Sequence, residues 1–120
     1  MTTIAKHILV DFKLDRQDLL TQPHPALEYL REAVVAGGAT VLQEHEHQFN
    51  PGGYTGFLLL AQSHATIHTW PEDDMLSIDV FACGDIDKGV ILRILRERFT
   101  PVAERVEFHR RGFPTGPDGS

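Results

Sequence analysis

Residues 62–84 read QSHATIHTWPEDDMLSIDVFACG, two alternating runs of polar and apolar side chains around a central Pro-Glu-Asp-Asp turn. Successive side chains of a strand point to opposite faces of its sheet, so each run separates into two sets. One face collects the polar and aromatic side chains of both runs: His64, Thr66, His68 and Trp70 from the first, and Ser77, Asp79, Phe81 and Cys83 from the second. We therefore expect two neighbouring antiparallel strands, over residues 64–70 and 75–83, whose shared face forms the wall of a polar site.

The rest of the chain supplies four further strands and two helices. Alternation predicts strands over residues 4–13, 39–48, 54–61 and 102–110. Apolar side chains at helical spacing predict helices over residues 25–36 and 86–99, the first ended by Gly37-Gly38 and the second capped by Asp85. Each helix has a single apolar stripe, which favours an α+β fold: a two-layer sandwich of an antiparallel sheet with two helices packed on one face. The Gly- and Pro-rich residues 112–120 are expected to be mobile or to lie on the surface.

Composition restricts the class of protein. A chain of 120 residues fits a single domain, residues 1–120, with one modest core. The net charge of −6 argues against nucleic acid or an anionic membrane as the main partner and favours a small cationic ligand. The single cysteine, Cys83, cannot form an intramolecular disulfide, and no apolar run reaches the ~20 residues that span a bilayer. We expect a soluble, cytoplasmic protein.

Three kinds of chemistry could use the polar face, and the residues alone leave all three open. Cys83 and His68 could form a thiolate nucleophile and its base, although no oxyanion-hole motif accompanies them. His64 and His68, with His45 and His47, could bind zinc or another metal, although no cysteine pair or HExxH motif supports this. The third option is that Ser63 cleaves its own backbone.

The run SHATIHTWPE at residues 63–72, followed by DVFACG at residues 79–84, resembles the signature of the short prokaryotic S-adenosylmethionine decarboxylase proenzymes. KHILVDF at residues 6–12 and FNPGGYTG at residues 49–56 are also similar to this family. The resemblance extends over about residues 6–111. It implies the S-adenosylmethionine decarboxylase-like fold and a pyruvoyl-dependent enzyme that decarboxylates S-adenosylmethionine for polyamine (spermidine) biosynthesis.

The resemblance also implies a self-processing reaction. The Ser63 hydroxyl attacks the carbonyl of Gln62, and elimination of the resulting ester separates a β chain, residues 1–62, from an α chain, residues 63–120. The dehydroalanine left at position 63 hydrolyses to a pyruvoyl group, the self-generated cofactor, which binds the substrate amine as a Schiff base. His68 is implied to be the base that removes the serine α-proton, with Thr55 supporting processing from the preceding loop. Cys83 is implied to be the proton donor in decarboxylation.

Substrate binding and assembly follow from the same resemblance. Phe49 and Trp70 are implied to hold the adenine ring between them, and Glu72 to bind the ribose hydroxyls. No metal is implied. Members of the family form homodimers with each site near the interface, so we expect a homodimer of αβ units.

The chain departs from the family pattern in three places. Gln62 replaces the usual glutamate before the processed serine, Thr55 replaces a serine, and Asp73-Asp74-Met75 replaces small or aromatic residues. The two aspartates could favour a more cationic substrate, such as ornithine or arginine, with the same pyruvoyl chemistry. A second alternative is an unprocessed, non-enzymatic homologue that binds a nucleoside or a partner subunit.

Overall fold

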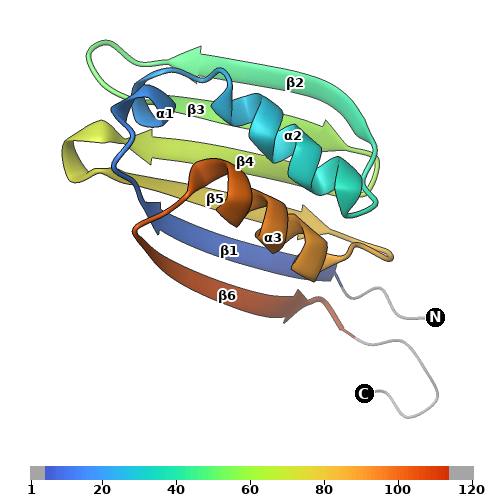
Figure 1. The fold of residues 1–120 in the computed structure, drawn as a ribbon. Coiled ribbons are helices and arrows are strands. Elements are labelled where there is room, and N and C mark those ends of the chain that lie inside the picture. Colours follow the sequence, from blue (N-terminus) through green and yellow to red (C-terminus); the bar gives the residue numbers. More distant parts are fainter. Residues whose placement is uncertain (1–4, 114–120) are drawn as a thin grey trace, which may run out of the picture.

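Six antiparallel strands form one sheet in the computed structural model, which describes residues 5–113 (Figure 1). The strands are β1 (Ala5–Lys13), β2 (Val41–Gln48), β3 (Tyr54–Leu60), β4 (Ser63–Trp70), β5 (Met75–Ala82) and β6 (Ala103–Arg111), and their order across the sheet is β2-β3-β4-β5-β1-β6. The helices are α1 (Gln17–Thr21), α2 (Ala26–Ala36) and α3 (Lys88–Phe99), and the 3₁₀ turn η1 (Pro71–Asp73) joins β4 to β5.

The helices cover one face of the sheet, and α2 and α3 pack against each other there (Figure 1). The opposite face, which we call the open face, has no helix on it in the described part of the chain (Figure 1). This arrangement confirms the predicted α+β sandwich. No helix within residues 5–113 is both long enough and apolar enough to cross a membrane.

The core lies between the helices and the covered face of the sheet. Alternation places the apolar side chains of each strand on that face, and the helical stripes meet them. Fully buried side chains of this core include Ile8 and Phe12 of β1, Leu58 of β3, Ile67 of β4, Leu76 of β5, Leu27 and Leu30 of α2, and Phe99 of α3. The polar set of each central strand is thereby turned to the open face.

Two buried hydroxyl groups tie α1 to the sheet. Thr69 is 8% exposed, and its hydroxyl donates to the carbonyl of Leu20 at 2.7 Å and accepts the backbone N–H of Tyr54 at 3.0 Å. The hydroxyl of Tyr54 donates to the carbonyl of Leu19 at 2.7 Å, and burial raises the pKa of this phenol. These bonds satisfy polar groups that would otherwise be buried without partners.

The structure differs from the sequence predictions mainly at element ends. Helix α1 was not predicted, and α3 begins at Lys88 with Asp87 as its cap, whose side chain accepts the N–H of Val90 at 3.1 Å. The prediction that Asp85 caps this helix is therefore wrong. Thr55 lies within β3 and not in a loop before the cleavage hairpin. Most of the predicted mobile tail, residues 114–120, lies outside the described residues.

We predict that Thr69→Val lowers the free energy of unfolding by about 1–3 kcal/mol, because it leaves the Leu20 carbonyl and the Tyr54 N–H buried without their partner. Urea denaturation followed by circular dichroism measures this loss. Thr69→Ser keeps the hydroxyl and is the matched control, which should retain most of the stability. Equal losses in the two variants would contradict a role for the hydrogen bonds.

Candidate active site

The bond between Gln62 and Ser63 lies in the tight hairpin that joins β3 to β4. Leu60 pairs with Ser63, so the loop contains only Ala61 and Gln62. The φ angle of Ser63 is +151°, in a region that residues with a side chain rarely adopt. The backbone carbonyl of Gln62 accepts a hydrogen bond from the backbone N–H of Cys83 at 3.1 Å. The side-chain oxygen of Gln62 accepts one from the backbone N–H of Thr40, also at 3.1 Å. The backbone of Ser63 is thus strained, and two hydrogen bonds, from Cys83 and Thr40, hold Gln62 in place before it.

His64 contacts the Ser63 hydroxyl. The distance from Ser63 Oγ to His64 Nδ1 is 3.2 Å. The imidazole stacks between two phenyl rings. Its centroid is 5.9 Å from that of Phe57 and 5.7 Å from that of Phe81, and the angles between the ring planes are 19° and 15°. The two rings come from the strands on either side of β4, and they hold the imidazole next to the serine.

Cys83 directly follows β5, and its thiol is free and exposed. Because Ala82 is the register partner of Ser63, the cysteine lies at the same end of the sheet as the hairpin. We call Gln62, Ser63, His64 and Cys83 the hairpin group.

A second set of predicted residues lies at the other end of the open face. Thr55 Oγ1 is 3.1 Å from His68 Nδ1, and the His68 ring lies 6.3 Å from that of Trp70. Phe49 follows β2 and packs edge-on against His47 at 4.8 Å, while Glu72 is exposed in η1. Phe49 and Trp70 are 50% and 38% exposed, so both rings are accessible to a ligand. We call Phe49, Thr55, His68, Trp70 and Glu72 the distal group.

The two groups do not meet within one chain. Ser63 and His68 are five residues apart on the same strand, which at ~3.3 Å per residue places them about 16 Å apart. His68 pairs with Ser77 whereas Cys83 lies beyond Ala82, so the nucleophile–base pair of Cys83 and His68 does not form in a single chain. The structure therefore brings together Ser63 with Cys83, and Thr55 with His68, as two separate sets.

A third set of polar side chains lies between them: Thr66 and Asp79, which the sequence predicts on this face, with His7 and Arg111, which it does not single out. His7 Nε2 is 3.0 Å from Asp79 Oδ1, and Arg111 Nη1 donates to His7 Nδ1 at 3.2 Å. Thr66 also donates to Asp79, at 3.5 Å. His7 and Asp79 are 72 positions apart in the chain, so only the pairing of β1 with β5 shows that they are partners.

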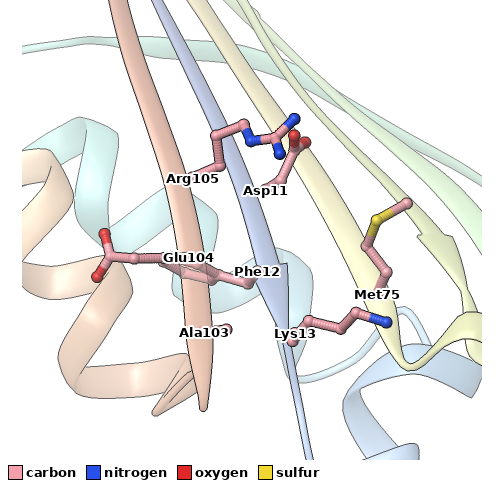
Figure 2. A pocket seen from close by; sticks show the side chains of 7 residues that line it. All are labelled: Asp11, Phe12, Lys13, Met75, Ala103, Glu104 and Arg105. Atoms are coloured by element: carbon pink, nitrogen blue, oxygen red, sulfur yellow. The ribbon is translucent and has the colours of Figure 1, made fainter.

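A cavity of about 280 Å³ opens where β1, β5 and β6 meet; the residues that line it are Asp11, Phe12, Lys13, Met75, Ala103, Glu104 and Arg105 (Figure 2). Met75 is the register partner of Trp70, so the cavity borders the distal group and lies away from Ser63.

Known proteins share this sequence pattern and this fold. The family model described as S-adenosylmethionine decarboxylase matches residues 6–112. The chain belongs to the S-adenosylmethionine decarboxylase family. The proenzyme of Aquifex aeolicus is 35% identical over 92% of this chain and 82% of its own length. The proenzyme of Hydrogenobaculum sp. is 43% identical over 72% of this chain, which spans 65% of that relative's length. The crystal structure of the Aquifex aeolicus adenosylmethionine decarboxylase superposes with a TM-score of 0.82 at 34% identity, covering 93% of each chain. The expected family and fold are confirmed.

The departures from the S-adenosylmethionine decarboxylase pattern have local structural consequences. The Gln62 amide supplies the same kind of acceptor oxygen to Thr40 that a glutamate would supply. Asp74 accepts a hydrogen bond from the side chain of Gln17 at 2.8 Å, so this acid helps to hold α1 beside η1. Asp73, in contrast, has an exposed side chain next to Glu72.

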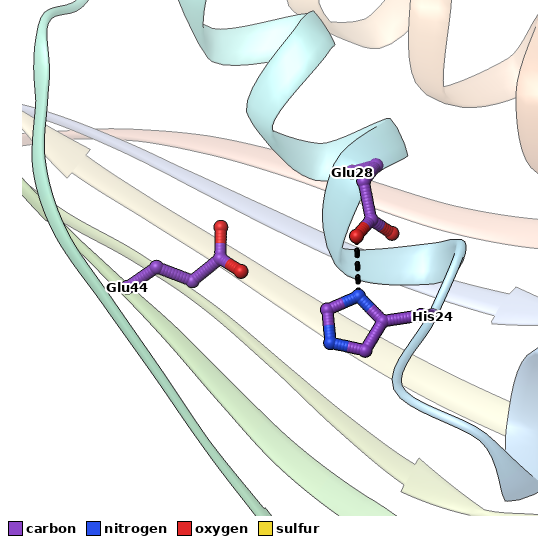
Figure 3. Close-up of side chains that lie close together, drawn as sticks. All are labelled: His24, Glu28 and Glu44. Carbon is purple, nitrogen blue, oxygen red and sulfur yellow. Dashed lines mark hydrogen bonds and ion pairs between the residues drawn. The ribbon is translucent and has the colours of Figure 1, made fainter.

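The four histidines proposed as alternative zinc ligands are not brought together. His45 bonds Gln43 at 3.0 Å, His47 packs on Phe49, and the other two contact Ser63 and Thr55. Among the described residues, a cluster with suitable ligand atoms forms elsewhere, from His24, Glu28 and Glu44 between α2 and β2 (Figure 3). These groups have protein partners, since His24 pairs with Glu28 and with Glu46 at 2.6 Å, and Glu44 pairs with Arg31.

The His24 cluster should make stability depend on pH. Burial lowers the pKa of His24, but the hydrogen bonds and charges of Glu28 and Glu46 together raise the pKa more, so it lies above its ordinary value. Protonated His24 therefore stabilises the fold below pH ~6.5, and this contribution is lost as the pH rises through the folded-state pKa. We predict that His24→Gln destabilises the protein more at about pH 5.5 than at about pH 8.5, as measured by urea denaturation. Equal destabilisation at both values would contradict this.

Proposed function

We propose that this chain is a self-cleaving, pyruvoyl-dependent S-adenosylmethionine decarboxylase of the cytoplasm, where reducing conditions keep Cys83 a thiol. The observation that carries the proposal is the hairpin: Ser63 lies on a strained backbone, and the carbonyl that it would attack is hydrogen-bonded to the Cys83 N–H. Ser63 itself is the source of the pyruvoyl group, so the site needs no other cofactor-binding residues.

The hairpin residues support the first processing step. Ser63 Oγ forms a bond to the carbonyl carbon of Gln62 while the C–N bond breaks, which turns the amide into an ester. Negative charge develops on the Gln62 oxygen, where the N–H of Cys83 already donates at 3.1 Å. His68 would then remove the α-proton of Ser63, and elimination would release residues 1–62 and leave a dehydroalanine at position 63. Hydrolysis of this dehydroalanine releases ammonia and leaves the pyruvoyl group at the start of residues 63–120.

The same face would bind the substrate. The pyruvoyl group supplies an electrophilic carbonyl that takes up the electrons released with carbon dioxide. Trp70 and Phe49 offer accessible rings for an adenine and for the sulfonium cation beside it. Glu72, two residues after Trp70, would bind the ribose hydroxyls, and the Cys83 thiol would return a proton to the product.

We further propose that each site is built from two chains. In one chain His68 is about 16 Å from Ser63, yet His64 of the hairpin group and His68 and Trp70 of the distal group lie on the same uncovered face, because they alternate with the buried Ala65 and Ile67. A two-fold interface is isologous: if the hairpin group of one protomer contacts the distal group of its partner, the reverse contact also forms. Packing the open faces of two copies together in this way makes two equivalent sites and gives the expected homodimer of αβ units.

We predict that purified protein consists of two chains, residues 1–62 and 63–120, and that Ser63→Ala abolishes both cleavage and activity. Cys83→Ala should still cleave, because the N–H that donates to Gln62 belongs to the backbone, but its turnover should fall by about 100-fold or more. Intact-mass spectrometry and release of labelled carbon dioxide measure the two effects. An unbroken wild-type chain would instead favour a non-enzymatic homologue. Faster release of carbon dioxide from ornithine or arginine than from S-adenosylmethionine would show that the preferred substrate is a different amino acid.

The two-chain site makes a separate prediction. A His68→Ala chain should remain uncleaved when expressed alone. It should be cleaved when co-expressed with a Ser63→Ala chain of different mass, because one site of the mixed dimer then combines an intact Ser63 with an intact His68. Co-expression with a Ser63→Ala/His68→Ala chain is the control and should give no cleavage. Failure of the first pair to cleave would show that His68 acts within its own chain.

A further inference from the structure

His64 is the histidine that contacts the Ser63 hydroxyl group within one chain. Neighbouring residues on a regular strand point to opposite faces, so their side chains seldom meet. Here the positive φ of Ser63 breaks the alternation and leaves its Oγ 3.2 Å from Nδ1 of His64. His68, in contrast, is engaged with Thr55 and lies about 16 Å away in the same chain.

The imidazole of His64 is also held in a fixed position. Phe57 is its diagonal neighbour on β3, and Phe81 is its direct register partner on β5. Both phenyl rings lie within 20° of parallel to the imidazole, at centroid distances of 5.9 and 5.7 Å. An imidazole fixed between two apolar rings needs little reorganisation to take a proton from the adjacent hydroxyl.

We propose that His64 is the general base of the first processing step, in which the amide becomes an ester; this rests on the proposed self-cleavage. With its ring proton on Nε2, His64 accepts the Ser63 Oγ proton at Nδ1 as Oγ attacks the Gln62 carbon. It then gives that proton to the backbone nitrogen of Ser63 as the C–N bond breaks. One C–O bond forms, one C–N bond breaks, and the proton moves from oxygen to nitrogen without any other reactant.

Two histidines then share the processing reaction. His64 governs the conversion of amide to ester, and His68 governs the later loss of the α-proton. A variant blocked only at the second step can still form the ester, which hydroxylamine cleaves while leaving ordinary amides intact. The two steps can therefore be measured separately in the full-length chain.

The experiment compares His68→Ala with His64→Phe/His68→Ala, and the measured quantity is the rate of hydroxylamine-dependent cleavage after Gln62. Phenylalanine preserves a ring between Phe57 and Phe81 but has no basic nitrogen. We expect the rate to fall by about 100-fold in the double variant, the size of effect typical of a general base. An unchanged rate would overturn the role of His64.

A second variant separates loss of the base from loss of packing. His64→Ala leaves a slot between the two phenyl rings, and free imidazole should restore part of its cleavage rate. The slot is filled in His64→Phe, so imidazole should have no effect on that variant. Cleavage of both variants at the wild-type rate would overturn the His64 assignment alone, whereas an uncleaved wild-type chain would overturn self-processing and this assignment with it.

Discussion

The register of β4 between β3 and β5 is the constraint on which the candidate site depends. A shift of one residue would turn His64, Thr66 and His68 toward the helices and bring the apolar set to the open face. Burial of Ala65 and Ile67 opposes that shift, since each is 0% exposed beneath the helices. The hydrogen bonds of Thr69 to two neighbouring segments oppose it as well. Core packing on one face thus fixes the positions of the reactive side chains on the other.

The same register produces backbone strain at Ser63, next to the bond that is proposed to break. Leu60 and Ser63 must pair across a loop of two residues, and Ser63 takes the positive φ angle that a glycine would adopt more easily. Such a conformation costs of order 1–3 kcal/mol and persists only where neighbouring contacts enforce it. Here those contacts come from Thr40 and Cys83, both of which hydrogen-bond Gln62. Breaking the chain at this point would release the constraint.

Local patterns in the sequence were sufficient to predict the strands and the two long helices, because alternation and helical spacing are short-range signals. Helix α1 escaped prediction because its five residues are held by distant partners, Tyr54 and Thr69, which donate to Leu19 and Leu20. Asp87, and not Asp85, caps α3, a difference of two residues that composition alone does not resolve.

The site was predicted as a set of residues on one face, and the structure adds how that set is divided. Alternation shows that side chains of residues 62–84 share a face, but it does not show that they are close together. His68 is five residues further along the strand than Ser63. Two contacts depend on the order of strands in the sheet, which short-range sequence patterns do not show. They are the stacking of His64 between Phe57 and Phe81 and the pairing of His7 with Asp79.

Position 62 shows how a departure from the family pattern can be compatible with the proposed chemistry. The attacked group is the backbone carbonyl, and the side chain acts only by accepting the N–H of Thr40 at 3.1 Å. An amide oxygen makes this contact as a carboxylate would, although more weakly. The amide also places no negative charge beside the carbonyl oxygen, where negative charge must develop during attack. The exchange of glutamate for glutamine therefore weakens one anchor of the hairpin while removing one electrostatic cost of the reaction.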